Sequence, residues 1–519
     1  MLFNSNAFLL LLLPLAFAAH RLALRSRTAQ AAIAVLVVAS VAFYVSTNAA
    51  FAGILFASIL FNYAAGLALA RHRSRLLLII AICANLGLLG YFKYANFAIE
   101  NVNALFGATY PALEIALPVG ISFYTFTQLT YLVDAYVGKA KEKDILAYGL
   151  FVTFFPHLIA GPIMHHAQMM PQFKRKPAQA RLASLAPAGL FLLGVGLVKK
   201  LYIADPLSTL ASPMFDGAAQ GIDPNFFSAW VGAFAYAFQI YFDFSGYCDM
   251  AVGLALLFGI RLPANFNSPY KSTSIIAFWR RWHMTLSRLL RDYVYIPLGG
   301  NRRGVSRRYL NLMTTMLVGG VWHGASWNFV VWGGVHGLLL ALNHAWNALP
   351  FVRGGFRAPW LFGPLTFLAV TLAWVPFRAV DGDSALRILE TMAGAHGLAA
   401  PLELDWLLRR LGVDLSSFGV AIVAENERRD HYLALATMAA AAIIAFCAPN
   451  ALQIAARYRP TADFAADVAS DWSSDWRRKR QAWRFAPGVR SGVLVGAMIV
   501  AALMAVNAAR PSEFLYFQF

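Results

Sequence analysis

Long apolar segments, separated by short clusters of basic residues, limit the fold of this 519-residue chain more than any other feature. Hydrophobic residues make up 59% of the sequence and charged residues only 13%, whereas about a quarter of a soluble domain is charged. A helix of roughly 20 apolar residues crosses a bilayer with its backbone groups paired. We therefore predict an all-α polytopic membrane protein with roughly ten to twelve crossings.

The apolar segments are spread over the whole sequence. The first could be taken for a signal peptide, but its basic residues, Arg21, Arg25 and Arg27, follow the apolar stretch instead of preceding it, so we expect a retained span. Residues 154–166 carry Pro and Gly within an apolar run, which predicts a broken segment buried by protein or next to a cavity. Further spans are expected at 31–46, 51–70, 76–92, 189–202, 226–259, 309–320, 327–346, 361–377, 431–447 and 492–508.

The net charge of +18 comes from Lys and Arg that gather in short loops. Under the positive-inside rule, the basic clusters at 71–75 and 477–480 lie in the cytoplasm, and both termini lie outside. Because topology accounts for this charge, nucleic acid is not an expected partner. Anionic lipid headgroups and a phosphate-bearing ligand are the expected partners of these basic residues.

The sequence lacks the patterns of the common metal and cofactor sites. The cysteines Cys83, Cys248 and Cys447 are far apart and form no CxxC pair, so neither a zinc site nor a disulfide framework is predicted. Walker A, HExxH, GxSxG and Rossmann glycine patterns are also absent. We expect no metal and no bound cofactor, which leaves histidine as the residue to carry chemistry.

Three histidines, His323, His336 and His344, lie in or next to one apolar stretch. His323 stands in VWHGASWNF, beside glycines that permit close approach of a substrate. An imidazole can take a proton from a hydroxyl and return it to a leaving group, so His323 is the candidate general base. A histidine bonded to a neighbouring helix explains the same spacing equally well.

Two acids, Asp243 and Asp249, lie in the apolar segment 226–259 within YFDFSGYCDM. Acids at membrane depth are functional candidates, and these two could relay protons. They are six residues apart and have no paired base in the sequence pattern. Capping of a kinked helix, or hydrogen bonding to hydroxyls, is therefore the alternative interpretation.

Residues 278–308 are basic, aromatic and amphipathic. Eight arginines alternate there with tryptophans and tyrosines, which makes the segment too charged to cross the membrane. We predict an interfacial or re-entrant helix at the cytoplasmic face. Its arginines could bind the phosphates of a ligand or anchor the segment to anionic lipid, and both interpretations stay open.

Several longer motifs carry a family resemblance. They are PVGISFYTFTQLTYLVDAY, FFPHLIAGPI, YFDFSGYCDMAVGLALLFGI, NFNSPYKSTSIIAFWRRWHMTLSRLLRDYVYIPLGGNR, GGVWHGASWNFVVWGGVHG and the terminal FLYFQF. On these motifs the chain resembles the membrane-bound O-acyltransferases, and within them the bacterial alginate O-acetyltransferase group. The resemblance covers most of residues 1–380 and the extreme C-terminus. Residues 396–490 match nothing familiar and are interpreted as a region for partner or substrate specificity.

The resemblance implies a ring of tilted helices around a central tunnel, with a cytoplasmic entrance for acyl-CoA. It implies that His323 is catalytic and that His283 is a second family position in support. The residues expected to bind acetyl-CoA are Arg280, Arg281, Trp279 and Trp282. The two arginines are chosen because their charge suits its phosphates.

The terminal FLYFQF fits F-x-Y-x-x-F, the ending of a small partner peptide in the related teichoic-acid D-alanylation system. By this resemblance Tyr516 would accept acetyl near His323 and present it to a periplasmic enzyme. A phenol, with a pKa of about 10, is a better leaving group than an alkyl hydroxyl. The alternative for Tyr516 is an aromatic anchor at the outer interface.

The resulting hypothesis is a bacterial inner-membrane enzyme that takes acetyl from cytoplasmic acetyl-CoA for O-acetylation of an exported polysaccharide. Alginate is the first acceptor expected, with cellulose and peptidoglycan as alternatives. Expected partners are a periplasmic SGNH-type O-acetyltransferase, polysaccharide synthesis and export proteins, and membrane lipids. A proton-coupled transporter and a non-catalytic scaffold are the rival classes. We expect a single membrane-embedded domain over 1–519, with a core at about 1–380 and a last span and periplasmic tail at 491–519.

Overall fold

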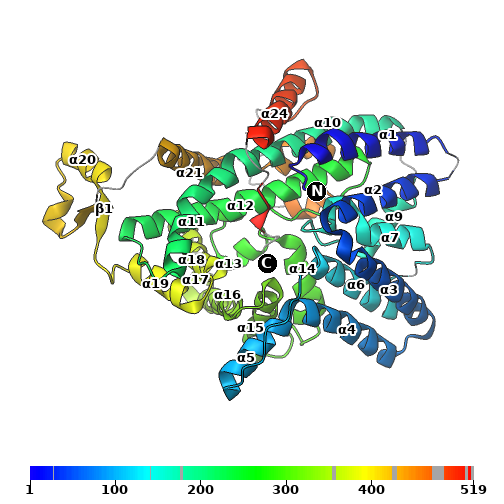
Figure 1. Cartoon of the computed structure of the whole chain (residues 1–519), viewed down its shortest axis with the longest axis horizontal. Helices are drawn as coiled ribbons and strands as arrows, with labels where there is room; N and C mark the ends of the chain where they lie inside the picture. The colour runs from blue at the N-terminus through cyan, green and yellow to red at the C-terminus, as the bar shows by residue number, and fades with distance from the viewer. Residues whose placement is uncertain are drawn as a thin grey trace.

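The computed structural model of the chain is helical along almost its whole length (Figure 1). Within the described residues, the short strands β1 (Ala399–Pro401) and β2 (Ala421–Val423) form one parallel pair. The predicted all-α class is therefore confirmed. The described residues are 1–26, 28–140, 142–175, 179–353, 358–423, 429–469, 484–508 and 512–515.

The helices cover both halves of the chain. Those up to residue 220 are α1 (Leu13–Ala23), α2 (Gln30–Asn48), α3 (Ala52–His72), α4 (Arg75–Leu89), α5 (Ala95–Phe106), α6 (Ile121–Tyr136), α7 (Ile145–Thr153), α8 (Phe155–Leu158), α9 (His166–Phe173), α10 (Gln179–Val198) and α11 (Asp205–Ala219). Those that follow are α12 (Phe226–Leu257), α13 (Ile275–Trp279), α14 (Met284–Leu290), α15 (Val305–His323), α16 (Trp327–Trp346), α17 (Pro350–Arg353), α18 (Pro359–Arg378), α19 (Gly382–Met392), α20 (Leu402–Arg410), α21 (Arg429–Cys447), α22 (Ala451–Ile454) and α24 (Val489–Ala508). Tighter or wider turns extend several of them, and π-helical turns include Ala7–Leu12, Gly90–Tyr94, Lys199–Ala204 and Arg291–Tyr295.

Within the described part of the chain, seven helices are long and apolar enough to cross a membrane. Two shorter apolar helices, Ala7–Ala23 and Tyr432–Cys447, add to them. The predicted span 327–346 has the same bounds as α16, and the predicted span 361–377 lies within α18. A multi-pass membrane protein is confirmed, whereas the number of crossings and the central tunnel stay predictions.

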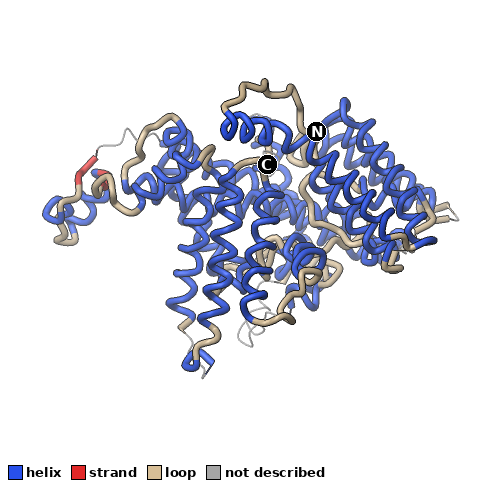
Figure 2. The backbone as a smooth tube through the Cα atoms, turned by 90° about the horizontal axis from the view of Figure 1, so that it is seen from below, coloured by secondary structure: helices blue, strands red, loops and turns tan. Residues whose placement is uncertain are grey.

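Helix α12 forms the axis of the fold. It packs along α10 and α11, and all its residues from 235 to 257 are buried. Figure 1 shows α1 to α4 on one side of it and α16 to α19 on the other, and Figure 2 places the strand pair at the far edge of the molecule. The helix is continuous through Asp243 and Asp249, so neither acid caps a helix end or a kink.

The predicted broken segment at 154–166 is confirmed. Helix α7 ends at Thr153, α8 is a single short turn, and α9 begins only at His166. Every residue from 154 to 164 is buried. Irregular backbone is tolerated at membrane depth where protein covers it, as it does in this segment.

The predicted single amphipathic helix at 278–308 is wrong in one respect, because the segment is divided into short pieces. Helix α13 ends at Trp279, and α14 starts after His283, whose φ of +42° lies in the left-handed region. Backbone hydrogen bonds from Asn267 to Arg281 and from Met284 to Asn265 tie this turn to the preceding extended segment. The break therefore holds His283 inside the protein instead of at its surface.

Candidate active site

His323 is the last residue of α15, at the point where α15 turns into α16. The two helices approach each other through backbone contact. A Cβ atom on Gly320 would collide with the carbonyl oxygen of Phe329, and one on Gly333 would collide with that of Met316. These glycines therefore let α16 lie against the end of α15 and bring its aromatic side chains to the imidazole.

Aromatic side chains enclose His323, which is 4% exposed. The ring centroids of Trp322, Trp332 and Phe377 lie 4.9, 5.0 and 5.1 Å from that of the imidazole. They belong to α15, α16 and α18, so three helices contribute to one enclosure. Walls of this kind exclude water and strengthen the electrostatic interactions of the group inside.

Lys93 holds the end of the helix that carries His323. Its Nζ donates to the backbone carbonyl oxygens of Trp322 over 2.7 Å and of His323 over 2.9 Å. The last carbonyls of a helix lack intrahelical partners and carry partial negative charge, so a buried cation stabilises them. The sequence interpretation missed Lys93, because it follows directly after the predicted span 76–92. The sequence signal that could have found it is a lysine inside the apolar stretch YFKYANF, since a charged residue at membrane depth is a functional candidate.

His283 lies behind Trp322, with 6.1 Å between the ring centroids. Its Nδ1 is 3.1 Å from Oδ1 of Asn265, which also accepts the backbone N–H and the hydroxyl of Thr285. Because a backbone N–H can only donate, this atom of Asn265 is an oxygen and can only accept. His283 therefore donates from Nδ1, and in the neutral ring the lone pair lies on Nε2. Asn265 was not foreseen from the sequence.

His336 has the opposite tautomer. The indole N–H of Trp279 donates to Nδ1 of His336 over 3.2 Å, and an indole nitrogen is a donor only. The neutral ring of His336 therefore carries its proton on Nε2. Its centroid lies 4.8 Å from that of Trp332, the tryptophan that also contacts His323. A proton acceptor and a proton donor are thus arranged around the same aromatic cluster.

A cavity of about 660 Å³ adjoins this cluster. Its basic wall consists of Arg280, Arg288 and Arg291. His344 also lines the cavity. Arg291 also pairs with Asp292 through two hydrogen bonds of 2.7 and 3.2 Å. Several guanidinium groups around one cavity are the donors that suit phosphate groups.

The four residues implied to bind acetyl-CoA are in different places. Trp279 and Arg280 line the cavity. Arg281 contributes its carbonyl oxygen to the turn beside His283. Trp282 is 1% exposed and stacks in the aromatic core, with its ring 4.9 Å from that of Trp374. The structure therefore brings two of the four together and adds arginines from the next turns of the segment.

The acids of α12 are paired with lysines of the π-helical turn that follows α10, so the expectation of unpaired acids is wrong. Lys199 Nζ lies 2.6 Å from Asp249 Oδ2, and Lys200 Nζ lies 2.8 Å from Asp243 Oδ1. Lys200 also lies 2.9 Å from Asp205 Oδ1. This pairing removes the argument that the two acids lack a base, and the proton-relay interpretation stays a prediction.

Two histidines of the broken segment have structural partners. His157 Nε2 lies 3.1 Å from the carbonyl oxygen of Phe151 and donates to it. His166 lies 4.0 Å from Glu142, which Lys174 neutralises at 2.9 Å. These contacts favour the structural interpretation of this segment over a second site. Within the described residues, no group of three or more His, Cys, Asp or Glu could hold a metal ion.

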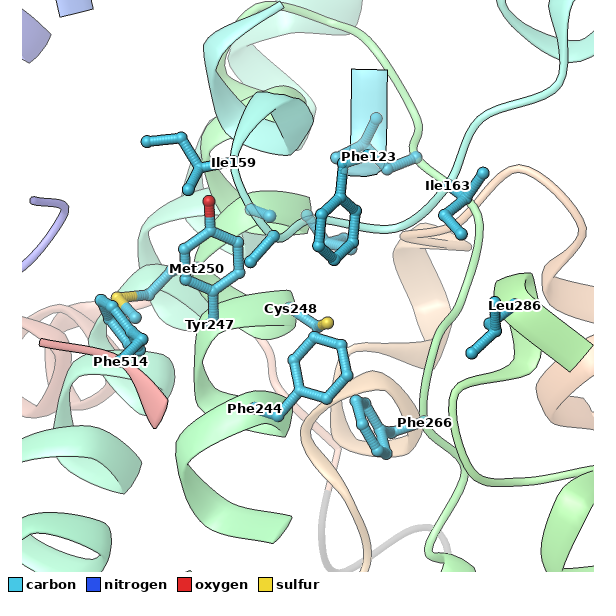
Figure 3. Close-up of a cluster of buried hydrophobic side chains, with 14 of the residues drawn as sticks. Phe123, Ile159, Ile163, Phe244, Tyr247, Cys248, Met250, Phe266, Leu286 and Phe514 are labelled. Atoms are coloured by element: carbon cyan, nitrogen blue, oxygen red, sulfur yellow. The ribbon is translucent and has the colours of Figure 1, made fainter. Parts of the chain in front are cut away.

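Tyr516 lies outside the described residues, so its role stays a hypothesis. The residues directly before it are described and lie against α12. Phe514 is 1% exposed, and its ring centroid lies 5.0 Å from that of Tyr247, as Figure 3 shows. The two residues directly before Tyr516, Phe514 and Leu515, are therefore buried.

An enclosed imidazole and an arginine-lined cavity, connected by contacting tryptophans inside a polytopic helical protein, fit group transfer from a phosphate-bearing donor. The MBOAT, membrane-bound O-acyltransferase family, matches residues 90–365, and the chain belongs to that family. It is an acyltransferase.

Individual relatives agree with this family. A peptidoglycan O-acetyltransferase of Helicobacter pylori is 43% identical over 397 residues, which cover 70% of this chain and 74% of the relative. A probable alginate O-acetylase of Pseudomonas aeruginosa is 42% identical over 406 residues, 76% of this chain and 75% of the relative. A teichoic acid D-alanyltransferase of Streptococcus thermophilus is 29% identical over 238 residues, 44% and 57% of the two chains. The predicted family resemblance is confirmed.

Proposed function

We propose that this acyltransferase moves acetyl groups from cytoplasmic acetyl-CoA across the bacterial inner membrane for O-acetylation of an exported polysaccharide. The names of the relatives support the reaction class, since one acts on peptidoglycan and another on alginate. Both acceptors are polymers outside the cytoplasm, whereas the proposed donor is inside it. The protein must therefore join a donor site and an acceptor site on opposite sides of the membrane.

The observation that carries the proposal is the contact path from the arginine-lined cavity to His323. Trp279 lines the cavity, and its ring centroid lies 5.7 Å from that of Trp332. The ring of Trp332 in turn lies 5.0 Å from His323. Contacting aromatic rings thus connect the cavity to the imidazole, and we propose that a donor with its phosphates on the arginines directs its acyl end toward His323.

The proposed chemistry is acyl transfer with His323 as general base. The phenol oxygen of Tyr516 attacks the thioester carbonyl of acetyl-CoA, and His323 takes the phenol proton. The C–S bond then breaks, and the thiolate leaves with the proton that the imidazolium returns. The products are acetyl-Tyr516 and free CoA, and transfer of the acetyl to an acceptor hydroxyl restores the phenol. His283, with its lone pair on Nε2, is proposed to support the base.

The acceptor is proposed to be alginate, with peptidoglycan as the second candidate. Probable alginate O-acetylases match at 38–42% identity, and the peptidoglycan O-acetyltransferase at 43% favours the alternative. A periplasmic SGNH-type O-acetyltransferase would complete the transfer, next to proteins of polysaccharide synthesis and export. Both termini are proposed to be periplasmic, and residues 1–519 to form one membrane domain with a periplasmic tail at 491–519.

A complementation experiment tests the proposed function. Cells that lack the gene receive the wild type, His323→Ala, or the control His72→Ala, whose exposed side chain ends α3. The O-acetyl content of alginate and of muropeptides is then measured by mass spectrometry. We expect the wild type and the control to restore acetylation of one polymer, and His323→Ala to lower it by about 10²–10⁴-fold. Full acetylation with His323→Ala would contradict the assignment.

A further inference from the structure

Residues Ser512–Phe514 have no regular secondary structure. Glu513 is exposed, whereas Phe514 and Leu515 are buried, at 1% and 9% exposed. Backbone groups that become buried in an irregular segment need hydrogen-bond partners from the protein around them. An apolar helix surface cannot supply these partners, so the residues that meet this segment define a binding site.

Three charged residues supply the partners. Lys200 Nζ donates to the carbonyl oxygen of Glu513 over 2.7 Å, and Asp243 Oδ2 accepts the backbone N–H of Leu515 over 3.0 Å. The hydroxyl of Ser512 donates to Asp205 Oδ2 over 2.7 Å. Because Lys200 is also paired with both acids, one ionic cluster holds three points of the segment.

The side chain of Phe514 fills a matching aromatic site. Its ring lies 4.7 Å from Nζ of Lys200, within the range of a cation–π contact. Its ring also lies 5.0 Å from that of Tyr247, and Phe3 stacks against the same tyrosine at 5.0 Å. Figure 3 shows Phe514 beside Tyr247 and Met250. The segment is therefore recognised both through its main chain and through one aromatic side chain.

A second ion pair on the same helices shows what is special about this cluster. Lys199 pairs with Asp249 at 2.6 Å. Lys199 is one position before Lys200 on the π-helical turn, and Asp249 is six positions after Asp243 on α12. Lys199 also bonds to Ser245, a neighbour on α12, so this pair joins the helices. Buried ion pairs contribute little net stability on average, and their best-attested use is to fix register. The pair of Lys200 and Asp243 differs, because both side chains also bond to the backbone of the tail segment, residues 512–515, and can fix its register.

We propose that Lys200, Asp243 and Asp205 form a binding site for residues 512–515, the tail clamp, which positions Tyr516 for acyl transfer at His323. This inference rests on the proposed role of Tyr516. Phe244, which follows Asp243 on α12, connects the clamp to one of the candidate histidines, since its ring lies 4.9 Å from that of His283. A segment fixed at Leu515 delivers the next residue to one place, which lowers the entropy cost of the reaction.

The test compares two charge-balanced double variants. Lys200→Met with Asp243→Asn removes the clamp, whereas Lys199→Met with Asp249→Asn is the matched control. Each is combined with Leu515→Cys in a background where the native cysteines are replaced by alanine, and reconstituted in vesicles. The rate at which a water-soluble maleimide labels residue 515 then reports how often the segment is released. Mass spectrometry of the peptide that contains residue 516 reports its acetylation from acetyl-CoA in the same preparations.

We expect labelling to be at least about tenfold faster in the clamp variant than in the control variant, since hydrogen bonds to charged groups are lost. Acetylation of Tyr516 should slow by a similar factor at unchanged KM for acetyl-CoA, because the donor cavity is untouched. Phe514→Ala leaves the ionic cluster intact and should also speed labelling, so the test does not depend on one variant folding.

Equal labelling rates in the two double variants would overturn the clamp. If labelling differs but the wild type never acetylates Tyr516, the proposed carrier role fails while the binding site for the segment stands. If the wild type acetylates Tyr516 and the clamp variant does so at the same rate, the positioning role fails. The two proposals can therefore fail separately.

Discussion

Two π-helical turns bring lysines into the interior, and the two lysines differ in what they hold. Lys93, in the turn Gly90–Tyr94, bonds to the carbonyl oxygens at the end of α15. Within the described residues it has no carboxylate partner. Lys200, in the turn Lys199–Ala204, has two carboxylate partners and bonds to the segment before Tyr516. A π-helical turn accommodates one extra residue, and such turns are frequent at functional sites.

The difference between these lysines teaches how the two proposed reactants are held. A cation bound only by carbonyl oxygens acts as a helix cap, so Lys93 fixes the place of His323. A cation shared by two acids keeps its charge compensated when a third partner leaves. Lys200 can therefore release the tail segment without leaving an uncompensated charge, whereas Lys93 is bound only to the end of the helix that carries His323. Substitutions at and around these sites can test the contrast.

The largest effect is expected at Lys93. Lys93→Met removes the cap and lets the end of α15 shift, and a misplacement of about 1 Å costs about 10²-fold in rate. We expect kcat for acetyl transfer to fall by about that factor, with the KM for acetyl-CoA unchanged and labelling at residue 515 unchanged. Lys139→Met, at an exposed position, is the control. Wild-type kcat in Lys93→Met would show that the cap does not position His323.

The glycine contact behind His323 is the next test. Gly320→Ala would drive a methyl group into the carbonyl oxygen of Phe329 and separate α15 from α16. Overpacking of this kind costs about 1–3 kcal/mol, and the thermal midpoint in detergent measures it. Gly87 lies on α4, and a Cβ added there would meet no atom within 4 Å. Gly87→Ala should therefore be neutral or slightly stabilising. Equal midpoints for the two variants would show that backbone contact at Gly320 does not hold the helices together.

The basic cavity predicts a change in donor binding alone. Arg280→Gln and Arg291→Gln should each raise the KM for acetyl-CoA by about tenfold, because a hydrogen bond to a charged phosphate is lost. The kcat at saturating donor should stay near the wild-type value. Arg281→Gln is the matched control, since Arg281 belongs to the same basic run without lining the cavity. A larger effect of Arg281→Gln would place the donor elsewhere.

The smallest effect is expected at an exposed ion pair, the counterpart of the buried lysines. The Arg387 guanidinium hydrogen-bonds to Asp223 and lowers the pKa of that carboxyl. A lowered pKa contributes stability above the unfolded value of about 4, and the contribution is lost as the pH falls through the folded pKa. Arg387→Gln should lower the thermal midpoint only slightly at pH 7 and less still as the pH falls toward about 3. A midpoint difference that grows toward low pH would have the wrong sign.

Much of the fold could be predicted from the sequence, because apolar length and flanking charge are local properties. The helix at 327–346 and the broken segment 154–166 are examples. The break at His283 could not be predicted, since it depends on backbone hydrogen bonds with Asn265 and Asn267. These residues lie on a separate extended segment, and helical periodicity carries no information about it.

The candidate site was predicted only in part. His323 and His283 followed from motifs and Arg280 from its charge, whereas Lys93 is 230 residues from the carbonyl of His323 to which it donates. The pairing of Lys200 with Asp243 likewise joins residues 43 positions apart. Long-range pairs of this kind depend on which faces of two helices meet. A single sequence does not contain that information.

The most direct test of acyl transfer at His323 is a single-turnover measurement in proteoliposomes. The purified protein is mixed with isotope-labelled acetyl-CoA, and the peptide that contains Tyr516 is analysed by mass spectrometry after quenching. We predict labelled acetyl on Tyr516 in the wild type and in His72→Ala, and almost none in His323→Ala. Donor-dependent acetylation of the acceptor by a Tyr516→Phe variant would contradict the carrier role. Label on Tyr516 at the wild-type rate in His323→Ala would contradict the role of His323 as the base.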